Sequence, residues 1–274
     1  MFVDLHVHSS VSTGRFSSGE ILQLAEKANT YVLSLTDHNT ATDPTDYKQT
    51  SIRLISGTEI SCCYEGQEVH ILGWGFNTGG MDEIFQKYKE VDRRGYIETI
   101  LHNLLSLGVD LGSYSHFLEK YPDKDISRLH LAEEAVRRSY VQTTAEFLNV
   151  YAGDRGLRLA FVPSPPPPVS LEEGVHSIIV NGGVPAVAHP MGYDTDLPKL
   201  IKTFKGLCGT HPSAIEAEYG PYNRAQRDYL GELAHRYGLL VSPGSDYHGF
   251  DPGEQMGGFK RCDFAPLLEA LNIE

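Results

Sequence analysis

Six histidines and two acidic residues stand out because imidazole and carboxylate groups are the ligands that several divalent metals prefer. His6 and His8 are separated by one residue, so on a strand both side chains would point to the same face. A set of this kind, without thiolates, suits Zn²⁺, Mn²⁺ or Fe²⁺ rather than a structural zinc site of the cysteine type. The remaining members of the set are His38, Glu59, His70, His189, Asp246 and His248.

Each of these residues also has an ordinary structural explanation. A single His-x-His pair is a weak indication of a metal site. Asp37, before His38, could be the N-cap of a helix, and His189, before Pro190, could be a core histidine at a turn. Eight ionisable groups on one surface would, however, be unfavourable without a compensating charge. Because eight ligands are too many for one ion, we expect two or three divalent metals, first of all Mn²⁺, with Glu59 bridging two of them.

The elements that must position these groups are short apolar runs that alternate with helical patterns, which predicts an α/β fold with βα units and a parallel sheet. Ser17 and Glu20 form a capping box before one helix, and further helices are expected over 171–181 and 225–237. Parallel strands end on one face, so the eight groups near strand ends should converge at one rim. Seven strands are expected, over 2–8, 31–36, 52–56, 69–74, 184–189, 214–217 and 239–242.

One long stretch interrupts this alternation. From about residue 81 to 151 the pattern is helical, with apolar residues at helical spacing over 97–105. The stretch ends in a run that holds five prolines between 163 and 168, which is extended and cannot lie inside a helix or a central strand. We therefore predict a helical insertion over 78–168, and a main domain built from 1–77 and 169–274.

The overall composition is that of an acidic globular protein. The 274 residues include 36 Asp and Glu against 23 Lys and Arg, a formal net charge of −13 with histidine neutral. This charge argues against an extended nucleic-acid surface, which needs a basic footprint. The sequence shows no basic leader, no apolar run of about 20 residues for a membrane span, and no CxxC pair among its four cysteines. A cytoplasmic location without a membrane partner is therefore expected.

The same residues lie in six short motifs whose order and spacing resemble those of the PHP (polymerase and histidinol phosphatase) family. The resemblance covers 1–77 and 171–250, and it implies a distorted seven-stranded βα barrel, TIM-like, that hydrolyses phosphate esters at two or three metals. The motifs span Asp4–Ser9, Leu35–His38, Gly57–Ser61, Val69–Gly73, Ala188–Pro190 and Gly244–His248.

The resemblance also implies how the ligands are shared. One metal would be held by His6, His8, Glu59 and Asp246; a second by Glu59, His70 and His189; and a third by His38 and His248. Relatives usually supply one more Asp or His to the third metal a few residues after the His-x-His motif. This chain has Thr13 there, a neutral hydroxyl and a poor ligand, so the third site is expected to be weak, completed by water or empty.

The predicted insertion carries a second resemblance. Ile126–Ala132 is similar to a motif of the nucleotide-phosphatase branch, in which an arginine and a histidine reach the substrate from a cap over the barrel mouth. Arg128 and His130 would then bind a phosphate, since a guanidinium can clamp phosphate through two hydrogen bonds and a histidine can donate a proton. Ser127 replaces the usual glycine. The predicted catalytic residues are His130 and Asp37, and a solvated helix face is the alternative for Arg128 and His130.

These features predict hydrolysis of a phosphate ester, in which a hydroxide bridging two metals attacks phosphorus in line. The favoured substrate is small and phosphorylated: a nucleoside 3′,5′-bisphosphate or the 5′-phosphorylated end of an oligonucleotide. Two alternatives remain, a histidinol-phosphate phosphatase and a regulatory metal-binding domain without turnover.

Overall fold

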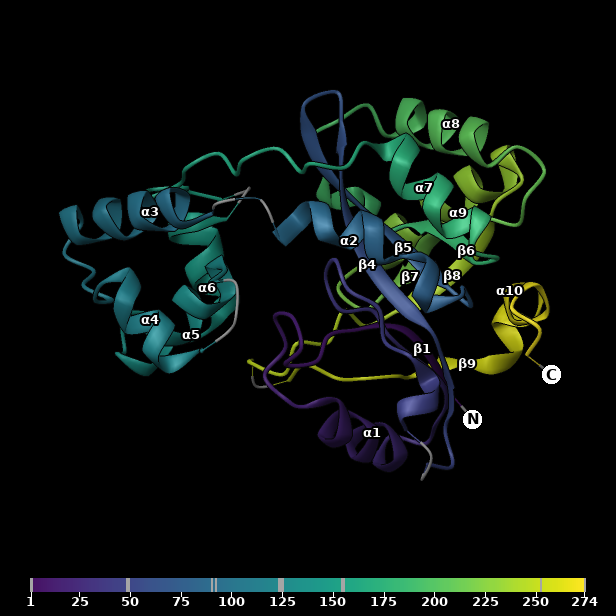
Figure 1. Ribbon diagram of the computed structural model, residues 1–274, viewed down its shortest axis with the longest axis horizontal. Coiled ribbons are helices and arrows are strands. Elements are labelled where there is room, and N and C mark those ends of the chain that lie inside the picture. Colours follow the sequence, from purple (N-terminus) through teal and green to yellow (C-terminus); the bar gives the residue numbers. More distant parts are fainter. Residues whose placement is uncertain are drawn as a thin grey trace.

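The computed structural model describes residues 2–47, 50–89, 91, 93–122, 126–153, 156–251 and 253–273, which form two β-sheets with helices packed around them (Figure 1). The smaller sheet has the order β3-β2-β1-β9, and the larger has the order β4-β5-β6-β7-β8. The strands are β1 (Phe2–Val7), β2 (Thr30–Leu35), β3 (Arg53–Ile55), β4 (Gly57–Tyr64), β5 (Gln67–Trp74), β6 (Val184–Val187), β7 (Ala214–Tyr219), β8 (Leu240–Gly244) and β9 (Phe259–Lys260).

The predicted α/β class is confirmed, but the strands are not all parallel. The β1–β2, β2–β3, β6–β7 and β7–β8 pairs are parallel, whereas β4–β5, β5–β6 and β1–β9 are antiparallel. The prediction omitted β4 and β9. Glu65 and Gly66 join β4 to β5 in a two-residue turn with positive φ at both positions, the geometry that suits a hairpin.

The two sheets meet at one end of the strands. The backbone N–H of Asp246, just after β8, donates to the His6 carbonyl of β1 at 2.8 Å, and that of His8 donates to the Tyr247 carbonyl at 3.0 Å. On the other side, His38 after β2 forms a parallel bridge with Glu59 of β4. These contacts bring the predicted ligands of both sheets together.

Helices cover the outer faces of both sheets. In Figure 1, α7, α8 and α9 gather on one side of the larger sheet, and α1 lies against the smaller one. Ser17 and Glu20 form the predicted capping box of α1, and Gly238 ends α9 in a left-handed conformation. Buried Ile21, Leu22 and other apolar side chains of α1 pack on β1 and β2. The helices are α1 (Ser18–Lys27), α7 (Leu171–Val180), α8 (Leu197–Cys208), α9 (Arg224–Tyr237) and α10 (Ala265–Ala270).

The helical stretch has an apolar core of its own. Ile100, Leu104, Phe117, Leu131 and Phe147 are buried together there, and none of the described residues between 78 and 168 lies in a strand. From this group, which stands beside the sheets in Figure 1, the proline-rich segment returns to α7 as an extended chain. The elements are α2 (Asp82–Lys89), α3 (Arg94–Ser106), α4 (Tyr114–Lys120), α5 (Arg128–Arg137), α6 (Thr144–Phe147) and a π-helical turn (Leu148–Ala152).

Helix α2 differs from the other helices of this stretch. Its buried side chains Ile84, Phe85 and Tyr88 pack into the core of the larger sheet, with Ile60 of β4. The separate helical core therefore starts only at α3. Among the described helices, none combines the length and the apolar character that crossing a membrane requires.

Candidate metal centre

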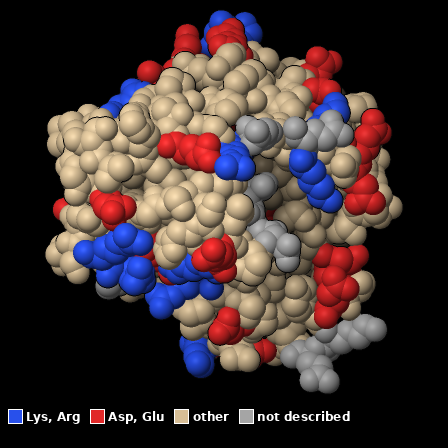
Figure 2. All heavy atoms as spheres, turned by 60° about the vertical axis from the view of Figure 1, so that its left-hand side comes forward, with Lys and Arg blue, Asp and Glu red and all other residues tan. Residues whose placement is uncertain are grey.

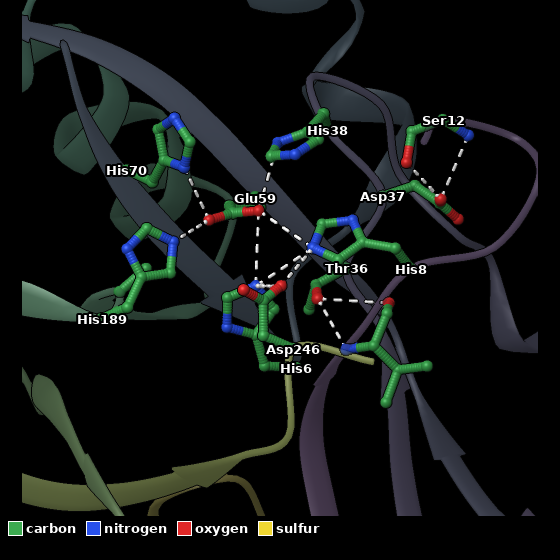
Figure 3. A network of polar contacts seen from close by, with 12 residues as sticks. His6, His8, Ser12, Thr36, Asp37, His38, Glu59, His70, His189 and Asp246 are labelled. Carbon is green, nitrogen blue, oxygen red and sulfur yellow. Dashed lines mark hydrogen bonds and ion pairs between the residues drawn. The ribbon is translucent and has the colours of Figure 1, made fainter. Parts of the chain in front are cut away.

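All eight predicted ligand residues lie at the end where the two sheets meet, and Figure 3 labels all of them except His248. They form overlapping groups in which the possible ligand atoms of each group lie within 4.8 Å of one another. The structure thus brings together side chains that are up to 242 positions apart in the chain, from His6 to His248. The groups are His6–His8–Asp246, His6–Glu59–His189, His38–Glu59–His70 and His8–His38–His248.

Two of these residues leave their strands in an uncommon backbone conformation. His189, two residues after β6, has φ 25° and ψ 54°, and Asp246, two residues after β8, has φ 54°. Positive φ is uncommon for residues other than glycine, and it occurs often at functional sites, where the surroundings hold the strained backbone. These turns direct both side chains inward instead of continuing the strand.

Glu59, near the start of β4, is the centre of the cluster. Its Oε1 lies 2.8 Å from His70 Nδ1 and 2.9 Å from His189 Nε2. Its Oε2 lies 3.1 Å from His8 Nε2 and from His38 Nδ1. Both oxygens of one buried carboxylate therefore face imidazole rings on opposite sides, the arrangement expected of a carboxylate shared by two cations.

The two carboxylates of the cluster are held in the charged form. Burial by itself would raise the pKa of Glu59, but the neighbouring histidines His38, His6 and His70 outweigh it and hold that pKa well below its usual range. The same balance, with His6 and His248 as the main partners, lowers the pKa of Asp246. The centre therefore offers two negative charges.

Burial and the facing carboxylates act in opposite directions on the imidazoles. Burial disfavours the charged form of His8 and His70, yet the facing carboxylates raise the pKa of His8 to about 9 and that of His70 to about 10. For His248, burial and the charge of His8 prevail and lower the pKa to about 4; the pKa of His38 is also well below its usual value, chiefly through burial. Two carboxylates cannot compensate six charged rings, so some imidazoles are neutral and have a free lone pair.

The donor set fits divalent cations. The buried atoms His8 Nδ1, His38 Nδ1 and Glu59 Oε2 have no hydrogen-bond partner, although unpaired buried polar atoms are rare and costly. His6 Nε2 and His8 Nε2 face one another at 3.1 Å. Buried imidazole nitrogens and carboxylate oxygens that point at one another without thiolates match the preferences of Zn²⁺, Mn²⁺ and Fe²⁺.

Thr13 lies at the third predicted site. Its hydroxyl is 3.1 Å from His248 Nε2. His248 also stacks on His8 with ring centroids 4.2 Å apart, and His8 lies 4.5 Å from His38. This part of the centre therefore contains three imidazoles and one neutral hydroxyl. A carboxylate in place of the hydroxyl would add a negative charge.

Asp37 does not join the ligand groups. Its buried carboxylate accepts hydrogen bonds from the backbone N–H groups of Ser9 and Ser12, at 2.9 and 3.2 Å, and from both serine hydroxyls, at 2.7 and 2.6 Å (Figure 3). These bonds hold the loop that follows His8 and carries Thr13. The catalytic role expected of Asp37 stays a prediction, while its contacts are those of a residue that fixes this loop.

The two insertion residues occupy different positions at the start of α5. His130 is 2% exposed; its Nδ1 lies 3.0 Å from the Ser127 backbone nitrogen and hydroxyl in a capping box, and its ring contacts Tyr121. Arg128 donates to the Ala152 carbonyl at 3.2 Å. Substrate contacts of Arg128 and His130 and proton donation by His130 stay predictions.

Glu68 links the insertion to the centre, and the sequence reasoning did not select it. Its carboxylate lies 3.2 Å from His70 Nε2. Burial would raise its pKa, but His70 and the positive charges of Arg93 and Arg128 lower it to about 2. The spacing of two between Glu68 and His70 on one strand was an available signal, because such residues share a face. Both arginines thus lie within electrostatic range of the edge of the centre.

Tyr193 is a further residue that the sequence reasoning did not place at the centre. Its hydroxyl accepts from the His70 backbone N–H at 2.8 Å and lies 3.3 Å from His189 Nδ1. The Tyr193 hydroxyl therefore contacts the backbone of one predicted ligand, His70, and the ring of another, His189. A tyrosine four residues after a histidine in a loop is not distinctive in sequence.

Comparison with known proteins gives relatives over nearly the whole chain, although no family model matches it. The chain is 29% identical over 254 residues to a 5′-3′ exoribonuclease of Haemophilus influenzae, covering 89% of both chains. It is 27% identical over 268 residues to a 3′,5′-nucleoside bisphosphate phosphatase of Chromobacterium violaceum, covering 92% of this chain and 88% of the relative.

Solved structures have the same fold. A Chromobacterium violaceum protein described as an amidohydrolase, with bound sulfate and no metal, superposes with a TM-score of 0.81 at 26% identity, over 98% of this chain and 96% of the other. A Bifidobacterium adolescentis protein assigned as a metal-dependent phosphoesterase superposes with a TM-score of 0.75 at 21% identity, over 98% of this chain and 96% of the other. At this identity the likeness is evidence for a shared fold only. The relatives confirm that the chain resembles the PHP family in its nucleotide-phosphatase-like branch, and they show that it is a metal-dependent phosphoester hydrolase.

Proposed function

We propose that this enzyme removes phosphate from a small phosphorylated substrate, either a nucleoside 3′,5′-bisphosphate or the 5′-phosphorylated end of an oligonucleotide. The observation that carries the proposal is the position of Glu59, whose two buried oxygens face five imidazoles from both sheets. The names of the relatives, an exoribonuclease and a bisphosphate phosphatase, support the nucleotide class.

The eight side chains would hold two or three cations, with Mn²⁺ the first expectation. His6, His8, Glu59 and Asp246 would hold one, and Glu59, His70 and His189 a second. His38 and His248 would hold a weaker third beside Thr13. When bound, divalent cations offset the charge of the phosphate and polarise the phosphoryl oxygen, so that phosphorus is open to attack. The protein contributes a buried frame that keeps the ligand atoms within reach of one another before any cation binds.

Arg128 and Arg93 are the residues that we expect to bind a second phosphate. Their positive charges help to lower the pKa of Glu68, which is bonded to His70 at the edge of the centre. Guanidinium groups bind phosphate through paired hydrogen bonds. On the side of the molecule seen in Figure 2, Lys and Arg side chains lie at the edge of a hollow. Local positive charge of this kind is compatible with the acidic net charge.

The domain division supports the same interpretation. We propose that residues 78–168 form a cap over the centre, which is built by 1–77 and 169–274, and that the two sheets are halves of a distorted barrel. The bridges of β1 with the segment after β8, and of His38 with Glu59, support a barrel that is closed at the ligand end. The separate apolar core of α3–α6 supports a cap that moves as one unit.

Activity assays with and without metal test this proposal. Purified protein is treated with a chelator, assayed, and then assayed again with Mn²⁺ or Zn²⁺ on four substrates: adenosine 3′,5′-bisphosphate, a short 5′-phosphorylated RNA, histidinol phosphate and p-nitrophenyl phosphate. We expect activity to disappear on chelation, to return with metal, and to be highest on the two nucleotide substrates.

Two variants sharpen the assay. Glu59→Gln should abolish activity with metal present, whereas Glu65→Gln should not, because Glu65 is an exposed hairpin residue paired with Lys199. Full activity in a metal-free preparation, or hydrolysis of histidinol phosphate alone, would contradict the proposed function.

A further inference from the structure

Strand β7 carries none of the eight predicted ligands, yet its side chains contact three of them. We propose that Glu216 and Tyr219 of this strand are positioning residues, which fix the rings and carboxylate of the centre in the orientation that binds metal. The inference rests on the proposed metal centre and adds two residues to it. The carboxylate of Glu216 reaches His6 and His189, and the hydroxyl of Tyr219 reaches Asp246.

Glu216 uses both of its oxygens. Its Oε1 lies 2.8 Å from His6 Nδ1, and its Oε2 accepts from the His189 backbone N–H at 2.6 Å. The residue is fully buried. A carboxylate only accepts, so His6 carries a proton on Nδ1, and in the neutral form of this ring the lone pair of Nε2 is available to a cation. That nitrogen lies 3.3 Å from both Glu59 and Asp246, where a cation would be shared.

The second bond of Glu216 holds the strained turn at His189. A backbone with φ 25° needs support from its surroundings, and the His189 N–H is anchored by the short bond to Glu216. One carboxylate therefore fixes the tautomer of one ligand and the backbone of another. Metal-ligating histidines commonly donate their second ring N–H to a carboxylate, which orients the ring and raises its basicity.

Tyr219 does the equivalent for Asp246. Its hydroxyl donates to Asp246 Oδ2 at 2.8 Å, while Oδ1 of the same carboxylate lies 3.1 Å from His8 Nε2. One oxygen is thus held by the tyrosine and the other faces the ligand group.

A β-bulge brings these two side chains to the same side. In a regular strand, residues three apart point to opposite faces. In β7, Glu216 pairs with Ser242 and Glu218 pairs with Pro243, so one extra residue is inserted between them. This shift allows Glu216 and Tyr219 both to reach the ligands, while Glu218 pairs with Arg227.

Gly244 leaves the space that Glu216 occupies. A Cβ atom at this position would lie 2.0 Å from Glu216 Oε1 and 2.5 Å from His6 Cβ. Any larger residue would therefore displace the carboxylate from the histidine. The contact between Glu216 and His6 thus depends on the shape of β8 as well as on β7.

The decisive variant is Glu216→Gln, which keeps the size but changes one acceptor into a donor. The amide can satisfy His6 or His189, but not both in their present form. If its NH₂ faces His6, the ring must accept at Nδ1 and carry its proton on Nε2, where the metal binds; if it faces His189, two donors oppose each other. Either outcome should weaken metal binding without removing any ligand.

Metal affinity, measured by competition with a coloured chelator and by elemental analysis after dialysis, tests the inference on the full chain. We expect Glu216→Gln to bind Zn²⁺ and Mn²⁺ about 10- to 100-fold more weakly than the natural protein. Gly244→Ala should lose affinity in the same direction, and Tyr219→Phe by a smaller factor. The matched controls Glu218→Gln and Tyr229→Phe should bind as the natural protein does.

A spectroscopic measurement separates orientation from general damage. Long-range ¹H–¹⁵N spectra of the Zn²⁺-loaded, histidine-labelled protein should show His6 protonated at Nδ1, and Glu216→Gln should lose this signature. Unchanged affinity and unchanged His6 spectra in a folded Glu216→Gln variant would overturn the inference and leave the proposed function intact. If that variant does not fold, undiminished affinity in Tyr219→Phe would overturn it. A natural protein that binds no cation would contradict the proposed function, and this inference with it.

Discussion

The carboxylate of Asp251 accepts hydrogen bonds from the backbone N–H and the hydroxyl of Thr144, at 2.7 and 2.8 Å. Asp251, in a loop of the main domain, thereby binds the first turn of helix α6 of the insertion, a helix whose N-cap residue is Thr143. The same loop is tied to the centre, because Glu254 accepts from the backbone N–H groups of His248 and Asp251, both at 3.1 Å. A continuous set of hydrogen bonds therefore connects the insertion to a predicted ligand.

Removing these hydrogen bonds should loosen the insertion and the ligand loop together. We expect Asp251→Ala to lower the free energy of unfolding by about 0.5–2 kcal/mol, the range for losing a side-chain acceptor of a helix's first N–H groups. Hydrogen exchange should become faster in α6 and in 248–251, and KM for adenosine 3′,5′-bisphosphate should rise more than kcat falls.

Asp196→Ala is the matched control, since Asp196 caps α8 by accepting from the Lys199 N–H at 3.1 Å, within the main domain. It should lose similar stability without faster exchange in α6. Equal exchange in α6 for both variants would argue against the connection.

Asp37 provides a second test, which separates a structural from a catalytic role. Four donors of Ser9 and Ser12 converge on its buried carboxylate, and the NH₂ group of an asparagine would oppose one of them in place of Oδ2 or three in place of Oδ1. We expect Asp37→Asn to lower the free energy of unfolding by about 1–3 kcal/mol, as for other buried donors that lose their acceptor. Thermal and urea unfolding measure this change.

Asp43→Asn is its control. Asp43 accepts from the Thr45 N–H and hydroxyl at 2.8 and 2.7 Å and from the Thr78 hydroxyl at 2.9 Å, but it is only half-buried, so water can replace the lost bonds. Its unfolding free energy should change by a few tenths of a kcal/mol. Full stability of Asp37→Asn combined with lost activity would instead favour the catalytic role predicted from the sequence.

The sequence predicted the ligands better than the strands that hold them. His6, His8 and His189 could be selected because each lies on or directly after a recognisable apolar strand. Glu59 was selected as a residue after the third strand, whereas it belongs to β4, which runs in the same direction as β6; the strand that runs in the opposite direction is β5, which carries His70. The reversal depends on the Glu65–Gly66 turn, and local apolar patterns do not reveal strand direction.

The supporting residues could not be predicted for a related reason. Glu216 and Tyr219 are three residues apart, so the regular alternation of side chains along a strand would place them on opposite faces of the sheet. Only the bulge in β7, which depends on pairing with β8, brings them to one side. Similarly, His130 occurs in a recognisable motif, but its burial against Tyr121 depends on how α4 and α5 pack.

The stability of the insertion should depend on pH through Glu134. This buried carboxylate accepts from Arg137 Nε at 2.8 Å and from Arg138 Nε at 2.6 Å. The bonds from Arg137, opposed by burial and assisted by Arg138 and Lys120, hold the pKa of Glu134 well below its usual range. Because the folded pKa lies below the unfolded value of about 4.3, the contribution is complete above that pH and is lost as the pH falls below it.

Hydrogen exchange in α5 as a function of pH checks this expectation. The natural protein should lose protection below about pH 4.3, whereas Glu134→Gln should be less stable by about 1–3 kcal/mol at neutral pH and less sensitive to acid. Glu98→Gln is the control, because Glu98 forms an exposed pair with Arg94, and such pairs contribute about 0.2–1 kcal/mol. Identical acid profiles for the natural protein and Glu134→Gln would exclude Glu134 as the origin.

Thr13 determines how many cations the centre holds, if the third group binds metal as proposed. The group consists of His8, His38 and His248, with the Thr13 hydroxyl 3.1 Å from His248 Nε2. Neutral imidazoles and a hydroxyl supply no negative charge of their own, and Glu59 and Asp246 are the carboxylates of the neighbouring groups. We therefore expect about two tightly bound cations per chain after dialysis, measured by elemental analysis.

Thr13→Asp adds a carboxylate at hydrogen-bond distance from His248 and should raise this number toward three, whereas Thr13→Asn, equal in size but neutral, should leave it unchanged. Three tightly bound cations in the natural protein would show that Thr13 does not weaken the third site, and an unchanged number in Thr13→Asp would show that charge at this position is not what limits it.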